Sequence, residues 1–176
     1  PEGVQTFMLQ TAILDRLTSS LCEAVTGQKD GQAALEMLDH ANLFIVPLDD
    51  ERCWYRYHHL FADLLLQRLN QTQSKQLPVL HCKASEWYEQ NGFLEKAIEH
   101  ALKGEDFDRA GNLIEGQFGV MYARGDHAIL RRWMATIPEE FFLSKPHLCI
   151  IHAWNLFTRG QLDAADESLH VARKLL

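Results

Sequence analysis

Histidines are the side chains of this sequence that most invite a chemical role. Nine are present, and the pairs His58-His59 and His81-Cys82 are the densest groups. Adjacent residues rarely chelate one ion, and neither group has a second such pair one helical turn away. We therefore expect scattered structural histidines and no metal site.

Acid–base or nucleophilic catalysis is also not indicated. Glu139 and Glu140 are adjacent, and adjacent helical side chains point about 100° apart, so they would not converge on one substrate atom. We expect them at a solvated helix start after Pro138. The sequence has no G-x-x-x-x-G-K-[ST] loop and no G-x-G-x-x-G, G-x-S-x-G or H-E-x-x-H motif. We predict no catalytic residues and no enzyme activity for this chain.

Composition favours a packed protein of the reducing interior of a cell. Seventeen Lys and Arg stand against 24 Asp and Glu, which gives a net charge of −7 and disfavours binding to phosphate backbones. The four cysteines are far apart, as expected of reduced thiols in a cytoplasmic protein. No apolar run is long enough for a membrane span, and there is no signal peptide. The chain starts without Met and stops inside a helical pattern, so we expect a fragment of a longer protein.

The elements that position these residues differ between two halves. The first half mixes helical and alternating apolar patterns and ends in a polar stretch, residues 71–74, which we expect to be a linker. Three helices, a β-hairpin and a closing helix are the layout of a winged-helix domain, predicted here over residues 1–74. The expected elements are helices near residues 4–14, 21–25 and 33–41, strands over 43–48 and 54–57, and a helix from about His59.

The second half, residues 75–176, is helical throughout and repeats. Gly92, Gly125 and Gly160 lie 33 and 35 residues apart (125 − 92 and 160 − 125). Gly92 and Gly160 are each followed by an apolar residue two positions on and by Ala five positions on, and a weaker copy of this pattern starts at Gly125. This spacing brackets the period of tetratricopeptide repeats. We therefore predict a mainly α fold in which TPR-like antiparallel helical repeats follow the winged helix.

A winged helix raises the question of DNA binding. The expected reading helix carries Asp30, Glu36 and Asp39 without any Lys or Arg, and the turn at residues 49–52 is net negative. Placing that surface in a groove lined by phosphates would cost repulsion and release no counterions. We predict no direct DNA binding by this chain.

Several stretches resemble one bacterial family. FMLQTAILDRL at residues 7–17, ANLFIVPLD at 41–49 and WYRYHHLFADLL at 54–65 resemble the winged helix of the MalT-like, ATP-dependent LuxR-class activators. Residues 84–88 and 92–101 resemble the first helical repeats of that family. Such activators join a nucleotide-binding P-loop domain, a winged helix, a helical superhelix and a LuxR-type DNA-binding domain, and this chain resembles only the middle portion.

The resemblance implies a regulatory role. ATP or ADP would bind the full-length protein but not this fragment, and the partners would be an intramolecular nucleotide-binding domain and an inducer or protein on the superhelix. Tyr57-His58-His59-Leu60 stands where related signal-transduction ATPases carry Met-His-Asp-Leu, whose His contacts the β-phosphate of ADP. The resemblance thus implies nucleotide sensing by His58, with His59 in place of the Asp.

Two alternatives remain open at the level of sequence. His58 can instead cap or pack at the junction between strand and helix. The whole chain can instead be a stand-alone TPR-like adaptor that binds proteins without nucleotide.

Overall fold

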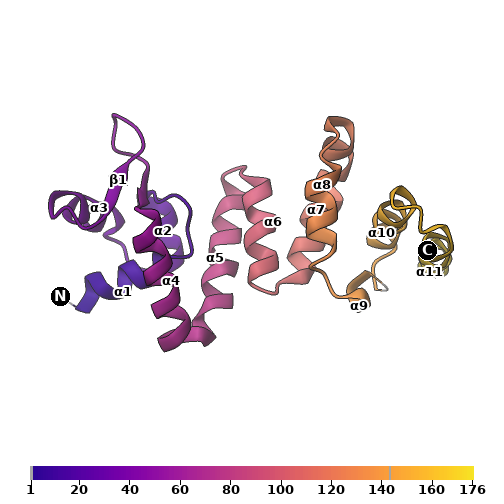
Figure 1. The fold of residues 1–176 in the computed structure, drawn as a ribbon, viewed down its shortest axis with the longest axis horizontal. Coiled ribbons are helices and arrows are strands. Elements are labelled where there is room, and N and C mark those ends of the chain that lie inside the picture. The colour runs from indigo at the N-terminus through magenta and orange to yellow at the C-terminus, as the bar shows by residue number, and fades with distance from the viewer. Residues whose placement is uncertain (1, 143) are drawn as a thin grey trace. The chain divides into compact units, whose positions relative to one another are not determined.

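The structure is a computed structural model that describes residues 2–142 and 144–176. Most of these residues are helical, as the sequence predicts, and one short β-hairpin interrupts the helices (Figure 1). The chain divides into two compact units, Pro1–Phe93 and Leu94–Leu176, here called unit 1 and unit 2. No helix within the described ranges is both long and apolar enough to cross a membrane.

Unit 1 has the three helices, hairpin and closing helix predicted for a winged helix. Its elements are α1 (Glu2–Thr11), α2 (Ser19–Thr26), α3 (Gly31–His40), β1 (Ile45–Pro47), β2 (Tyr55–Tyr57), α4 (His59–Gln73), a 3₁₀ turn η1 (Ser74–Gln76) and α5 (Leu77–Gln90). Helix α2 lies at the centre, where it packs against α1, α3 and α5. Its buried Leu21, Cys22 and Val25 form the inward face that holds these helices together.

The hairpin is joined through β2 to the segment between α1 and α2. Strands β1 and β2 are antiparallel, with Ile45 opposite Tyr57 and Pro47 opposite Tyr55. Tyr55 also exchanges two backbone hydrogen bonds with Leu17, of 2.7 and 2.8 Å, in the segment between α1 and α2. Tyr55 and Tyr57 are buried while Arg56 is exposed, so the predicted alternation of strand faces is confirmed.

Two sequence-based expectations about element ends in unit 1 are wrong. The first strand is shorter than residues 43–48, because Asn42 and Phe44 have positive φ values of 50° and 56°, which turn the chain before β1. Residues 71–74 are not a linker, because α4 continues to Gln73 and η1 begins at the next residue. The domain boundary expected at residue 74 stays a prediction.

Unit 2 is a series of paired helices. They are α6 (Leu94–Lys103), α7 (Phe107–Arg124), α8 (His127–Met134), the single turn α9 (Glu139–Phe142), α10 (Pro146–Thr158) and α11 (Leu162–Leu175). Helices α6 and α7 pack together, α8 packs against both, and α10 packs against α7 and α11. The core between them includes the fully buried Ile98, Ala110 and Ile114. Small Ala97 and Ala165 are buried as well, as expected at close helix contacts.

The repeated glycines lie in the turns between helices. Gly125 ends α7 in the left-handed conformation, with φ 79°, and its N–H donates back to the carbonyls of Met121 and Tyr122. Gly92 and Gly160 have φ values of 79° and 74°. A positive φ is favourable for glycine and costly for other residues. The need for this conformation at each of these helix-ending turns explains why the glycine spacing follows the helical repeat.

Candidate functional site

His58 lies where β2 passes into α4. It is the N-cap residue of α4, its N–H donates to the Phe44 carbonyl at 2.7 Å, and its carbonyl accepts from Phe61 and Ala62 at 2.9 Å. The imidazole is exposed and makes no cap hydrogen bond. Its ring lies against that of His59, with centroids 4.5 Å apart. The backbone of His58 is therefore fixed, while its side chain projects from the helix start.

The residue before His58 is anchored in the core. The Tyr57 hydroxyl is 2.8 Å from Thr11 Oγ1, and Thr11 donates its own proton to the Phe7 carbonyl at 2.8 Å. Because Thr11 has one proton, Tyr57 must be the donor to Thr11. Burial raises the pKa of Tyr57, which keeps this donor protonated. The hydrogen bond ties β2 to α1 and so sets the position of His58.

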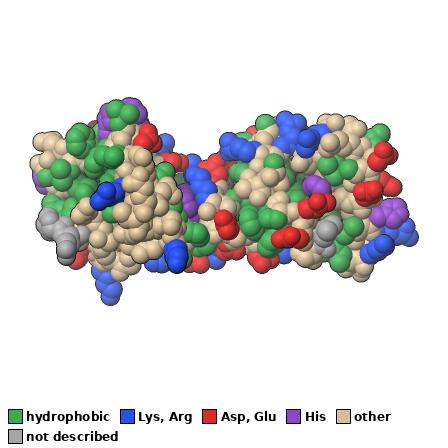
Figure 2. All heavy atoms as spheres, turned by 60° about the horizontal axis from the view of Figure 1, so that its bottom comes forward, with side chains coloured by type: hydrophobic (Ala, Val, Ile, Leu, Met, Phe, Trp, Pro, Cys, Tyr) green, Lys and Arg blue, Asp and Glu red, His purple; other side chains and the backbone are tan. Residues whose placement is uncertain are grey.

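Apolar side chains surround the helix start. We call Phe44, His58, His59, Leu60 and Leu64 the hairpin–helix face. Phe44, Leu60 and Leu64 are 59%, 67% and 59% exposed. Phe44 packs on Phe61 of α4 with ring centroids 5.0 Å apart, and Leu60 and Leu64 are one turn apart on that helix. Apolar side chains are visible at the surface of both units (Figure 2), but a cluster of this exposure is typical of an interaction surface.

The electrostatics of the helix start favour an anion. No acidic residue lies in the first turn of α4. The first N–H groups of a helix have no intrahelical acceptor, and the helix dipole adds partial positive charge there. Helix α4 has 15 residues, so about four turns of aligned peptide dipoles contribute to this partial charge. The arrangement can therefore accept a phosphate oxygen beside the His58 imidazole.

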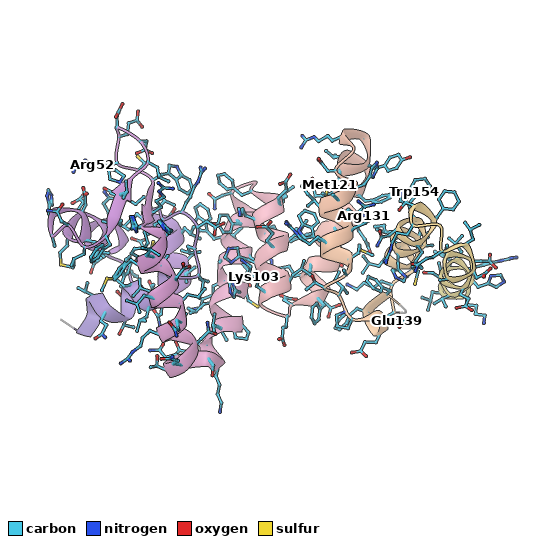
Figure 3. The ribbon with its side chains drawn as sticks, viewed as in Figure 1. Arg52, Lys103, Met121, Arg131, Glu139 and Trp154 are labelled. Atoms are coloured by element: carbon cyan, nitrogen blue, oxygen red, sulfur yellow. The ribbon has the colours of Figure 1, made fainter. Side chains whose placement is uncertain are left out.

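The wing and α3 are electrostatically different. Arg52, at the tip of the hairpin (Figure 3), forms an ion pair of 2.8 Å with Asp39 of α3. The one cationic side chain of the turn at residues 49–52 is thereby paired with a carboxylate of α3. This is the helix that would have to contact the bases in DNA binding by a winged helix. Of the acidic residues predicted on this surface, Asp30 and Glu36 are exposed and Asp39 is partly buried.

Unit 2 contains a cavity of about 430 Å³ that sequence reasoning did not find. Glu139, at the start of α9 and exposed as predicted, lines it together with His152 of α10 (Figure 3 labels Glu139). No sequence pattern predicts that these two residues meet, because the lining residues come from separate helices. Within the described residues, no three His, Cys, Asp or Glu side chains are close enough to hold a metal ion.

The fold and the His58 junction define a class of protein: a winged helix that is followed in the chain by paired helices. Residues 1–77 match the family of the MalT winged helix domain. Residues 1–77 thus form a MalT-like winged helix, and the helical hairpins follow it in the chain.

Two curated relatives extend the similarity beyond the winged helix. The serine/threonine-protein kinases PknK of Mycobacterium tuberculosis and of Mycobacterium bovis are each 32% identical to this chain over 148 residues. The aligned stretch is 84% of this chain and 13% of each kinase. The chain therefore spans a small part of these relatives, and their names describe proteins much longer than the matched stretch.

Proposed function

We propose that this chain is the coupling portion of a bacterial, cytoplasmic, LuxR-class, MalT-like transcriptional regulator. In this proposal an ATP- or ADP-binding domain elsewhere in the full-length protein docks on unit 1, and a TPR-like superhelix that includes unit 2 receives an inducer or a protein partner. The chain itself has no catalytic activity and does not bind DNA directly. It transmits the occupancy of one site to the other.

The observation that carries the proposal is the position of His58. An exposed imidazole at the N-cap of a long helix, with no acidic residue in the first turn, can donate a hydrogen bond to a phosphate. The core hydrogen bond of Tyr57 holds the preceding strand, so the imidazole is presented from a fixed backbone. His58 would then contact the β-phosphate of ADP held by the neighbouring domain.

The hairpin–helix face supports the docking half of the proposal. Phe44, Leu60 and Leu64 are each more than half exposed and lie around the same helix start as His58. Burying such side chains stabilises association by about 25 cal/mol per Å² of apolar surface. A domain that covered this face would bring its bound nucleotide beside His58.

A second candidate function rests on the aromatic side chains of unit 2. Tyr122 and Phe157 are 45% and 55% exposed, and both lie against Trp154, at 5.3 and 5.6 Å between ring centroids. Exposed aromatic clusters are common at protein interfaces. This surface fits a stand-alone TPR-like adaptor, and the sequence upstream of residue 1 separates the two: a Walker-type loop there favours the regulator.

Replacing His58 by Ala in the full-length protein tests nucleotide sensing. We expect ADP to bind about tenfold more weakly, because a hydrogen bond to a charged phosphate is lost, and we expect basal activity to rise. The measurement is the ADP dissociation constant by isothermal titration, with reporter transcription in parallel. His40→Ala, at the exposed end of α3, is the control and should bind ADP like the wild type. Unchanged ADP affinity and basal activity in His58→Ala would refute the role.

A further inference from the structure

The cavity of unit 2 has the size and lining of a small-molecule site. Its volume of about 430 Å³ is within the range of ligand pockets. Its walls include apolar side chains such as Met134, Phe142 and Leu156. Among the described residues, four polar side chains from α9, α10 and α11 also line it: Glu139, His152, Glu167 and Ser168.

Hydrogen bonds fix which nitrogen of His152 carries the proton. Ser168 Oγ donates its one proton to the Cys149 carbonyl at 3.0 Å. His152 Nδ1 is 3.4 Å from the same Ser168 oxygen. Because Ser168 has no second proton, Nδ1–H must be the donor of that contact. The neutral ring then has a lone pair on Nε2, which is a hydrogen-bond acceptor.

Packing and burial favour this neutral form. The His152 ring is stacked on Phe142, with ring centroids 4.5 Å apart and planes 6° apart. Burial lowers the pKa of His152, and the Glu139 carboxylate only partly opposes this shift. At neutral pH the imidazole is therefore uncharged and oriented by Ser168.

The polar lining thus offers acceptors and negative charge. Glu139 and Glu167 bring carboxylates to the lining, His152 brings the acceptor Nε2, and none of the described residues that line the cavity is Lys or Arg. An anion would be repelled here, and an inorganic cation lacks a ligand set, since no three acidic, His or Cys side chains of the described residues converge. A complementary ligand carries N–H donors and positive charge at one end and an apolar body at the other.

We propose that the cavity between α8, α9, α10 and α11 binds a small organic cation, a primary ammonium group on an apolar body. The carboxylates of Glu139 and Glu167 attract the ammonium group, His152 Nε2 is an acceptor of the same lining, and the apolar body contacts the walls around Phe142. This inference rests on the proposed function for its consequence: the ligand would be the inducer that the superhelix receives.

The test uses the 176-residue chain and 2-phenylethylamine as the probe, with binding measured by isothermal titration and by ligand-observed NMR. The neutral 2-phenylethanol and the anionic 3-phenylpropanoate are the matched compounds. We expect the amine to bind roughly tenfold or more tightly than the alcohol, because only the amine gains the attraction of the two carboxylates. The carboxylate compound should show no binding.

Two double variants separate the cavity from general surface charge. Glu139→Gln with Glu167→Gln should weaken amine binding by about tenfold or more. Glu140→Gln with Asp166→Asn makes the same change in net charge one residue away, outside the cavity lining, and should leave binding unchanged. Circular dichroism checks that both variants fold.

The proposal would be overturned if the amine did not bind or if amine and alcohol bound equally. It would also be overturned if both double variants weakened amine binding equally. These outcomes are independent of His58, because the chain is tested without nucleotide. Loss of amine binding with an intact ADP effect of His58→Ala would reject the ligand and keep the proposed function. The reverse pattern would keep the cavity site and reject nucleotide sensing.

Discussion

Replacing Trp133 by Ala is expected to lower the free energy of unfolding of unit 2 by about 3–5 kcal/mol. Trp133 on α8 is 2% exposed and belongs to the core that contains Ile98, Ile114 and Leu148. These residues come from α6, α7 and α10, so Trp133 belongs to a core to which these three helices and α8 contribute. Its removal loses transfer free energy and leaves a cavity that the surrounding helices fill only in part. Urea denaturation followed by far-UV circular dichroism measures the loss without relying on indole fluorescence.

Phe157→Ala is the matched control for this result. Phe157 is an aromatic residue of the same unit, but 55% of it is exposed. We expect its replacement to cost less than about 1 kcal/mol, as for a surface position. A loss of similar size in both variants would contradict the core arrangement of unit 2.

Replacing Gly31 by Ala is expected to destabilise unit 1 by about 1–3 kcal/mol. Gly31 is the first residue of α3, and a Cβ there would lie 2.6 Å from the Ser19 carbonyl oxygen and 2.9 Å from Glu23 Cγ. The oxygen belongs to the backbone of α2, so it cannot rotate away as a side chain would. The clash would also disturb the 3.1 Å hydrogen bond from the Gly31 N–H to Glu23 Oε1.

Gly116→Ala provides the opposite expectation at a second helical glycine. Gly116 is inside α7, and a Cβ there would meet nothing within 4 Å. Alanine should therefore raise the free energy of unfolding by about 0.5–1 kcal/mol, through helix propensity alone. Thermal denaturation compares both variants. If Gly31→Ala were as stable as the wild type, the close approach of α2 and α3 would be wrong.

The order of elements in unit 1 could be predicted from the sequence, but the exact ends of its elements could not. Alternation at Tyr55, Arg56 and Tyr57 identified β2, because buried and exposed side chains alternate along a strand. Phe44 looked like part of the first strand, yet its φ of 56° places it in the turn before β1. Its β-forming side chain does not indicate that backbone conformation, and the Phe44 carbonyl accepts a hydrogen bond from the His58 N–H at 2.7 Å.

Polar composition also misled the prediction at residues 71–74. Gln71, Thr72 and Gln73 carry no apolar pattern, and we predicted a linker there. These residues extend α4, and Thr72 Oγ1 donates to the Arg68 carbonyl within the helix at 2.8 Å. No Gly or Pro interrupts this stretch, so nothing in it ends the helix.

The two candidate sites differ in how far the sequence could reach them. His58 was found because its motif is contiguous, and the structure places it at the start of α4. The cavity of unit 2 could not be found, because Glu139, His152 and Ser168 meet only through the packing of three helices. Glu139 was predicted at the surface and is exposed. His152 was predicted to be structural, and its ring is stacked on Phe142. Both residues also line the cavity.

Hydrogen–deuterium exchange of the full-length protein, with ADP or with ATP bound, tests the coupling directly. We predict that amides of residues 58–64 exchange more slowly in the ADP state, because the nucleotide-binding domain then covers the hairpin–helix face. Amides of α2, buried at the centre of unit 1, should exchange equally in both states. Equal exchange of residues 58–64 with ADP and with ATP would contradict the claim that this winged helix reads the nucleotide state.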